Sequence, residues 1–200
     1  MRVGSHVRPV VRLSELDPMV AYRLLADTVV PRPIALVSTL SPEGVANLAP
    51  FSFFGVGGSH PPSLVFSPTL NGRGEEKDTL RNIRANGEYV IHLVDRTLVD
   101  GMNATSASYH PHESEWPDSG FTPVAAQAVA PPVIAEAGAA FECRLHAIIE
   151  HGDGPSAARY VIGEALVMHG GPVAALARLG GNQYLDMAEA PAFELTRPLR

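Results

Sequence analysis

Short apolar runs separated by turn-forming residues make up most of the hydrophobic pattern of this chain. The run over residues 34–37 is typical of a buried strand. We therefore predict strands over residues 33–40 and 44–49, on either side of the Ser-Pro-Glu-Gly turn at 41–44. The turn-rich sequence 152–155 is expected to close a later hairpin. Similar patterns predict further strands over residues 64–66, 88–94, 140–150 and 159–169.

Helical signals are fewer and shorter than strand signals. Ser14 precedes an apolar stretch that predicts a short helix ending near Asp27. Residues 77–79 open an amphipathic pattern that stops at the Asn-Gly pair 86–87, which predicts a second helix. Short helices are also predicted over residues 95–103 and 173–179. Short strands joined by turns, with few helices, favour a closed antiparallel barrel with helices outside over a parallel βαβ array.

Residues 105–138 interrupt this pattern, because they are rich in Pro, Ser, Ala and His and show no clear period. A long irregular stretch in a compact domain is typical of a binding loop, and a surface excursion without a function is the alternative. With 200 residues and 46% hydrophobic composition, the chain can bury one sizeable core. We therefore expect a single domain over residues 1–200, with an N-terminal arm over residues 1–13.

Charge and cysteine content exclude several classes of protein. Charged residues make up 18% of the chain and the net charge is −6, so the basic patch of a nucleic-acid-binding protein is not expected. The single cysteine, Cys143, lies in an apolar run and fits a reducing compartment. The first residues lack the apolar core of a signal peptide, and no apolar stretch reaches the length of a membrane span. We expect a cytoplasmic protein with no membrane partner.

Sequence patterns of common catalytic and metal sites are missing. The chain contains eight histidines, including His110 and His112, but a zinc or iron site needs three or four convergent ligands, so no metal site is expected. The glycine cluster 55–58 does not follow the G-x-G-x-x-G spacing of a dinucleotide-binding βαβ unit. A serine-hydrolase G-x-S-x-G elbow is absent as well.

The predicted hairpin over residues 33–49 carries polar side chains in an otherwise apolar setting. Ser38, Thr39 and Asn47 lie on it, and Ser52 follows it. An unpaired buried hydroxyl or amide costs roughly 1–3 kcal/mol, so these groups need partners. The partners are either other groups of the protein or a ligand, and the residues themselves leave both alternatives open.

The order of these residues resembles the flavin reductase-like family, from about Tyr22 to the C-terminus. The similarity is carried by the segments Pro31-Arg32-Pro33, Val37-Ser38-Thr39, Gly44, Asn47, Ala49-Pro50, Ser52-Phe53-Phe54, Lys77-Asp78-Thr79, Asn82-Ile83, Met102-Asn103-Ala104-Thr105, Phe141-Glu142-Cys143, Gly163-Glu164, Arg178-Leu179-Gly180-Gly181 and Tyr184. The resemblance implies a mainly β fold, a Greek-key split β-barrel that binds FMN and carries a few peripheral helices.

The resemblance also implies a set of cofactor-binding residues: Arg32, Ser38, Thr39, Asn47, Ala49, Ser52, Ser67, Arg73, Lys77, Thr79 and Tyr184. The residues themselves support a phosphate site at the helix that opens at Lys77, because a helix N-terminus offers free N–H groups. Lys77 adds a charge, Thr79 a hydroxyl donor, and Arg73 can contribute from the preceding loop. The alternative is an ordinary solvated helix start, and the carboxylates of Glu75 and Glu76 count against a phosphate there.

The resemblance implies an FMN-dependent oxidoreductase, an NAD(P)H:flavin reductase that receives a hydride from NADH or NADPH at flavin N5. Hydride transfer requires stacking and orientation but no protein acid or base, so no catalytic side chain is expected. The family also contains reductase components that supply reduced flavin to a separate monooxygenase, which would then be a partner. The alternative is an FMN-binding electron carrier without its own nicotinamide site.

The resemblance further implies a homodimer with the flavin near its interface. We expect the irregular residues 105–138 and the segment 178–184 to lie near that boundary. Tyr184 combines an aromatic ring with a polar tip, which suits an interface or a stacked cofactor. A core tyrosine is the alternative for this residue.

Overall fold

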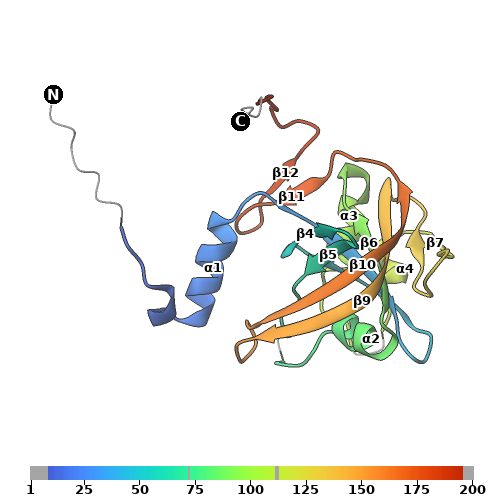
Figure 1. Cartoon of the computed structure of the whole chain (residues 1–200), viewed down its shortest axis with the longest axis horizontal. Helices are drawn as coiled ribbons and strands as arrows, with labels where there is room; N and C mark the ends of the chain where they lie inside the picture. The colour runs from blue at the N-terminus through green and yellow to red at the C-terminus, as the bar shows by residue number, and fades with distance from the viewer. Residues whose placement is uncertain (1–8, 72, 111–112, 196–200) are drawn as a thin grey trace.

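The computed structural model describes residues 9–71, 73–110 and 113–195. Its main element is a seven-stranded antiparallel sheet that curves into a barrel, in the order β3-β2-β6-β9-β10-β5-β4 (Figure 1). The mainly β fold predicted from the sequence is confirmed. The strands of this sheet are β2 Ala35–Leu40, β3 Ala46–Phe51, β4 Phe54–Ser59, β5 Pro62–Phe66, β6 Glu88–Leu93, β9 Ala139–His151 and β10 Ala158–Gly170.

Both faces of strand β2 are buried, and this explains why the sequence near its start is continuously apolar. Ala35 and Val37 point into the barrel, where they pack in the same cluster as Phe66. Leu36 belongs to the cluster on the other face, together with Trp116. The predicted hairpin of β2 and β3 is confirmed, and it presents its polar residues between these two cores.

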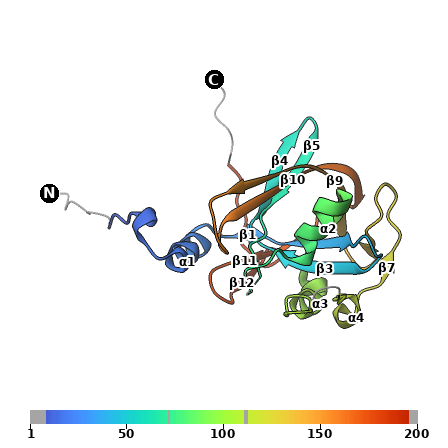
Figure 2. The same cartoon turned by 90° about the horizontal axis from the view of Figure 1, so that it is seen from below.

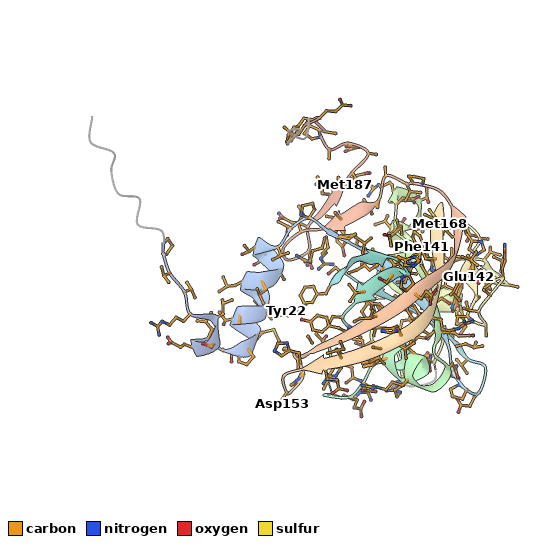
Figure 3. The ribbon with its side chains drawn as sticks, in the orientation of Figure 1. Tyr22, Phe141, Glu142, Asp153, Met168 and Met187 are labelled. Carbon is orange, nitrogen blue, oxygen red and sulfur yellow. The ribbon has the colours of Figure 1, made fainter. Side chains whose placement is uncertain are left out.

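The longest strands, β9 and β10, form the predicted hairpin and cross the front of the barrel (Figure 1). Asp153 marks its tip (Figure 3). The two strands bend at register shifts, one of which lies between Ile162 and Gly163. A Cβ atom at Gly163 would lie 1.8 Å from the hydroxyl oxygen of the buried Tyr89. Only glycine therefore allows Tyr89 to fill the barrel interior at this bend.

Helix α2, Asp78–Asn86, covers one end of the barrel and ends at Gly87, whose φ of 71° suits a helix stop. It buries Leu80 and Ile83 against the barrel core. Helix α1, Pro18–Thr28, is capped by the Asp17 carboxylate and stands apart from the sheet (Figure 2). Both helices confirm the sequence prediction within a few residues. The remaining helical elements are η1 Leu13–Glu15, η2 Arg96–Leu98, α3 Val99–Ala104 and α4 Trp116–Ser119.

The predicted helix over residues 173–179 is wrong. Its second half is strand β11, Leu176–Arg178, which pairs with β1, Arg32–Pro33, and β12, Tyr184–Asp186. The N–H of Leu176 donates instead to the carbonyl of Val94 at 2.6 Å, so long-range pairing overrides the local pattern. Strand β4, rich in glycine, was also missed.

The described residues of the range 105–138 include α4 and a small two-stranded sheet of β7, Pro123–Val124, and β8, Val133–Ile134. Helices α3 and α4 lie side by side next to β3 (Figure 2). In the described part of the chain, no helix has both the length and the apolar character needed to cross a membrane.

Candidate functional site

A cavity of about 790 Å³ opens where four separate parts of the chain meet. Its walls come from β3 and the residue after it, the loop into α2 with the start of that helix, the segment 102–109 from the end of α3 onward, and the C-terminal segment 178–184. A cavity of this size is within the range that holds cofactors and drug-sized ligands.

The cavity brings together most of the residues that the sequence analysis proposed for cofactor binding. Those that line it are Asn47, Ala49, Ser52, Arg73, Lys77, Thr79 and Tyr184. They are spread over more than 130 positions of the sequence. Tyr184 is 36% exposed, so it lies at the rim of the cavity and is not a core tyrosine.

The other candidate residues lie outside the cavity lining and have structural partners, with one exception. The guanidinium of Arg32 donates to the carbonyl oxygens of Ala26, Val29 and Leu179, and so ties the end of α1 to the segment before β12. The hydroxyl of Thr39 accepts from the side-chain amide of Asn82, and the hydroxyl of Ser67 accepts from the N–H of Arg159. The exception is Ser38, whose buried hydroxyl has no partner among the described residues.

The N-terminus of α2 brings a cation and free N–H groups to the cavity wall. Lys77 is its N-cap and makes no side-chain capping bond, and within the described chain no group accepts from the N–H of Asp78 or Thr79. The ammonium nitrogen of Lys77 lies 5.3 Å from the ring centroid of Phe51, and burial lowers the pKa of Lys77. The helix end thus offers unpaired N–H donors and a cation to an anionic ligand.

The carboxylates beside this helix start form ion pairs with arginines. Glu76 pairs with Arg84 at 3.0 Å, and Asp78 pairs with Arg81. Glu75 lies 3.8 Å from the guanidinium of Arg73. Lys77 has no ion-pair partner among the residues that the structure describes. The acidic neighbours therefore do not neutralise the charge that Lys77 presents to the cavity.

Glu115 is a buried, charged cavity residue that the sequence analysis missed. It precedes α4, is almost fully buried, and its Oε2 accepts from the N–H of Leu48 at 2.8 Å. Burial is the main cause that raises the pKa of Glu115 to about 7. The irregular composition of residues 105–138 was the only sequence signal, and the part of this region up to Tyr109 lines the cavity with Glu115.

The opposite rim is formed by Arg178 and Tyr184, which face each other across strands β11 and β12. The guanidinium carbon of Arg178 lies 4.6 Å from the ring centroid of Tyr184, and the side chain also donates to the tyrosine hydroxyl. This cation–π pair holds an aromatic surface and a positive charge at the mouth of the cavity.

Histidines do not assemble into a metal centre in the described residues, where no group of three or more His, Cys, Asp or Glu side chains converges. His112 is outside the described residues. His92 is buried, with Nδ1 2.9 Å from the carbonyl oxygen of Leu36, and its Nε2 accepts from the N–H of Ile134. Burial lowers the pKa of His92 to about 4, so it is a neutral structural link.

Comparison with known proteins decides the family. The family model described as "Flavin reductase like domain" matches residues 27–173. The chain belongs to the flavin reductase-like family. This family member is also 38% identical to the uncharacterized protein YwrF of Bacillus subtilis (strain 168), over 92% of this chain and 96% of that protein.

Solved structures of flavin reductase-like proteins share the barrel. Nitrilotriacetate monooxygenase component B from Bacillus cereus superposes with a TM-score of 0.88 at 30% identity, covering 96% of this chain and 100% of that one. The 2-nitrobenzoate 2-nitroreductase NbaA of Pseudomonas fluorescens gives 0.84 at 28% identity, covering 96% and 98%. A split-barrel protein from Shewanella frigidimarina, at 20% identity and a TM-score of 0.75, confirms the split-barrel fold.

The cavity of this flavin reductase-like protein fits a flavin nucleotide in its chemistry. A phosphate needs N–H donors and a cation, which the α2 start supplies together with Lys77. A ribityl chain needs hydroxyl and amide partners, which Asn47 and Ser52 can provide. The family and this donor set together identify a flavin-related oxidoreductase.

Proposed function

We propose that the protein is an FMN-dependent NAD(P)H:flavin reductase whose cavity holds the flavin nucleotide. The observation that carries the proposal is the α2 start, where Lys77 lacks an acidic partner among the described residues and the N–H groups of Asp78 and Thr79 are free of partners there. FMN ends in a phosphate, which these groups match, whereas riboflavin does not. Arg73, on the loop above, adds a second cation at the mouth.

The remaining cavity residues orient the rest of the cofactor. Asn47 and Ser52 offer polar groups to the ribityl chain or ring, and Ala49 leaves space for the ring to approach β3. FMN supplies the hydride-accepting N5 atom when it is bound. The protein residues bind the flavin, hold its ring at one angle and limit the access of water, which is the usual contribution of a protein to flavin chemistry.

We propose nicotinamide as the electron donor. Hydride transfer from nicotinamide to flavin depends on stacking and orientation and needs no acid or base from the protein, so this cavity could support it. The mouth of the cavity carries the Arg178–Tyr184 pair, which offers an aromatic face and a cation to a second nucleotide. The similar protein from Bacillus cereus is a monooxygenase component B, and the one from Pseudomonas fluorescens is a nitroreductase. We propose a separate monooxygenase as the partner that receives the reduced flavin.

Anaerobic reduction of the flavin tests this function directly. Purified protein loaded with FMN is mixed with NADH or NADPH, and the flavin absorbance is followed. We expect at least one of the nicotinamides to bleach the flavin faster with the protein present than with free FMN alone. If neither nicotinamide reduces bound FMN, the protein binds flavin as an electron carrier and the reductase proposal fails.

We also propose a homodimer with the flavin near its interface. Helix α1 supports this, because no residue of this 11-residue helix is buried and Val20, Leu24 and Leu25 are exposed. Its C-terminal end is tied through Arg32 to Leu179, the residue after Arg178 of the cavity rim. A second copy is the occupant that would cover α1 and the open side of the cavity in both protomers at once.

A further inference from the structure

The rim of the cavity is built on a small sheet of its own, in the order β1-β11-β12. In this sheet Arg32 on β1 lies opposite Arg178 on β11, which in turn lies opposite Tyr184 on β12. Arg178 and Tyr184 line the cavity, whereas Arg32 lies outside its described lining. One row of the sheet therefore leads from Arg32 to the two side chains at the mouth.

Arg32 is only 8% exposed, and its guanidinium joins two separate segments of the chain. Nη1 donates to the carbonyl oxygens of Ala26 and of Val29, the latter at 2.7 Å, and Nη2 donates to that of Leu179 at 3.1 Å. Ala26 and Val29 belong to the last turn and the C-cap of α1, where carbonyl groups carry partial negative charge and attract a cation. Leu179 directly follows Arg178 in the chain. The planar guanidinium thus fixes the rim against the end of α1.

Aromatic rings fix the α1 side of this junction. The guanidinium carbon of Arg32 lies 5.7 Å from the ring centroid of Phe53, within the range of a cation–π contact. The ring of Tyr22 on α1 lies 5.5 Å from that of Phe53, centroid to centroid, at an interplanar angle of 45°. Phe53 connects β3 with β4, so Arg32 and the end of α1 are held against the barrel. The guanidinium is therefore a fixed point from which the rim is positioned.

The rim side of the junction is a turn closed by its own hydrogen bonds. Between β11 and β12, the N–H of Leu179 donates to the carbonyl of Gln183 at 2.9 Å, and the N–H of Gln183 donates to that of Gly180 at 3.1 Å. The Arg178 side chain donates back into this turn and to the hydroxyl of Tyr184. The turn and the Arg178–Tyr184 pair thus form one unit, which Arg32 holds by the Leu179 carbonyl.

We propose that Arg32 is a positioning residue for the nicotinamide nucleotide: by holding the Leu179 carbonyl against the end of α1, it sets the place of the rim on which this nucleotide docks. The rim is the Arg178–Tyr184 pair together with the turn 179–183. This inference rests on the proposed function, because that function places the electron donor at the rim. It assigns Arg32 a role other than the direct cofactor contact that the family resemblance implies.

A rim displaced by loss of Arg32 should bind the nicotinamide nucleotide less well, while the flavin part of the cavity stays intact. The proposed flavin contacts lie on β3 and at the start of α2, on other segments than those that Arg32 joins. A residue that only positions the rim therefore lowers the KM for NADH or NADPH, and its loss raises that KM with kcat and the affinity for FMN unchanged. Loss of a residue that contacts the flavin would instead weaken FMN binding.

The test measures steady-state reduction of FMN by the nicotinamide that the wild type uses, together with FMN affinity by titration calorimetry, in the full-length protein. Arg32→Met retains an apolar stem and removes the three hydrogen bonds, whereas Arg32→Lys retains a charge that can make part of them. We expect the KM for the nicotinamide to rise about tenfold in Arg32→Met, the scale of one hydrogen bond to a charged group, and less in Arg32→Lys. Arg23→Met is the matched control, an exposed arginine on α1 that should change neither quantity.

Two further variants separate positioning from a direct role, and they keep the test decisive if Arg32→Met does not fold. Gly180→Val leaves Arg32 in place but pushes the turn away from α1, because a Cβ atom there would lie 2.4 Å from Oδ1 of Asp27. It should raise the same KM. Combining Arg32→Lys with Arg178→Ala should raise the KM no further than Arg178→Ala alone, since the rim that Arg32 positions is then already lost.

Failure of the positioning role and failure of the reductase give different results. An unchanged KM in both Arg32 variants, or a rise that adds fully to that of Arg178→Ala, would overturn the positioning role and leave the reductase standing. Weaker FMN binding in both Arg32 variants would overturn it too, because Arg32 would then be a cofactor ligand. A wild type that reduces FMN with neither nicotinamide would overturn the proposed function itself.

Discussion

At the scale of single residues, Glu142 shows how the barrel stabilises a buried carboxylate. It lies on β9 (Figure 3) with no exposed surface. Its carboxylate accepts from the N–H groups of Gln127, Ala128 and Val129. His169 Nε2 lies 2.6 Å from the same carboxylate. Burial opposes ionisation, but the hydrogen bonds from Gln127, His169 and Ala128 prevail and lower the pKa of Glu142.

We predict that Glu142→Gln lowers the free energy of unfolding by about 1–3 kcal/mol at neutral pH, because an amide NH₂ replaces an oxygen that accepts N–H groups of the 127–129 loop. Urea unfolding measures this loss. Glu88→Gln is the matched control, since Glu88 makes a single bond of this kind, to Ala130 at 2.9 Å, and should lose less. Equal stability of Glu142→Gln and wild type would show that the loop is held by other contacts.

The same variant has a predicted pH dependence. The folded-state pKa of Glu142 lies below its ordinary value of 4.5, so its ionisation stabilises the fold above that pH. This contribution is lost as the pH falls through the lowered pKa. The stability difference between wild type and Glu142→Gln should therefore shrink in acid. A difference that stays constant from neutral pH into this range would contradict the assigned role of the carboxylate.

The residues of the site divide by how local their sequence signals are. Lys77 and Thr79 were predictable because a few consecutive residues are enough to indicate where a helix begins after a loop. Asn47 was predictable because it interrupts an apolar hairpin. Glu115 was not, since its burial results from the packing of the aperiodic 105–138 region against β3, and no local pattern reports such packing.

At the scale of elements, α1 is a helix with no buried residue, whose contact with the barrel includes the stacking of Tyr22 against Phe53. An isolated helix of 11 residues is marginally stable in water, and its stability in proteins comes from packing of its apolar side. Val20 and Leu24 lie one turn apart and are 46% and 41% exposed. Their surface is the one that we expect a second protomer to cover.

We predict that the double substitution Val20→Asp and Leu24→Asp converts the protein to a monomer, because two carboxylates would have to be desolvated in the interface. Sedimentation velocity at micromolar concentration measures the outcome. Arg23→Ala, an exposed polar position on the same helix, should leave the dimer intact. A wild-type protein that sediments as a monomer with FMN bound would contradict the dimer itself.

Sequence patterns predicted elements best where local and long-range preferences agree. The β9–β10 hairpin and α2 have strong turns, stops and apolar periods of their own. Strand β4 carries several glycines and depends on pairing with β5 for its extended form. Strand β11 is set by β1, which lies more than 140 residues earlier in the chain, so residues 173–179 were misread as a helix.

At the scale of the whole molecule, the barrel acts as a frame that brings four distant segments around one cavity. Strand β3 provides one wall, the start of α2 the cationic end, the segment 102–109 together with Glu115 another wall, and the C-terminal strands β11 and β12 the rim. Arg32 fastens that rim to α1. The molecule therefore links its proposed cofactor site to its proposed dimer surface through a single buried guanidinium.

The central claim is that FMN occupies this cavity with its phosphate at the start of α2. Calorimetric titration of FMN and riboflavin into apoprotein, for wild type, Lys77→Ala and Lys77→Arg, tests it most directly. We predict that Lys77→Ala weakens FMN binding by roughly 1–3 kcal/mol, the scale of a charge-assisted hydrogen bond, while Lys77→Arg retains most of the affinity. Riboflavin should bind more weakly than FMN and be indifferent to the substitution. Unchanged FMN affinity in Lys77→Ala, or riboflavin binding as tight as that of FMN, would contradict the claim.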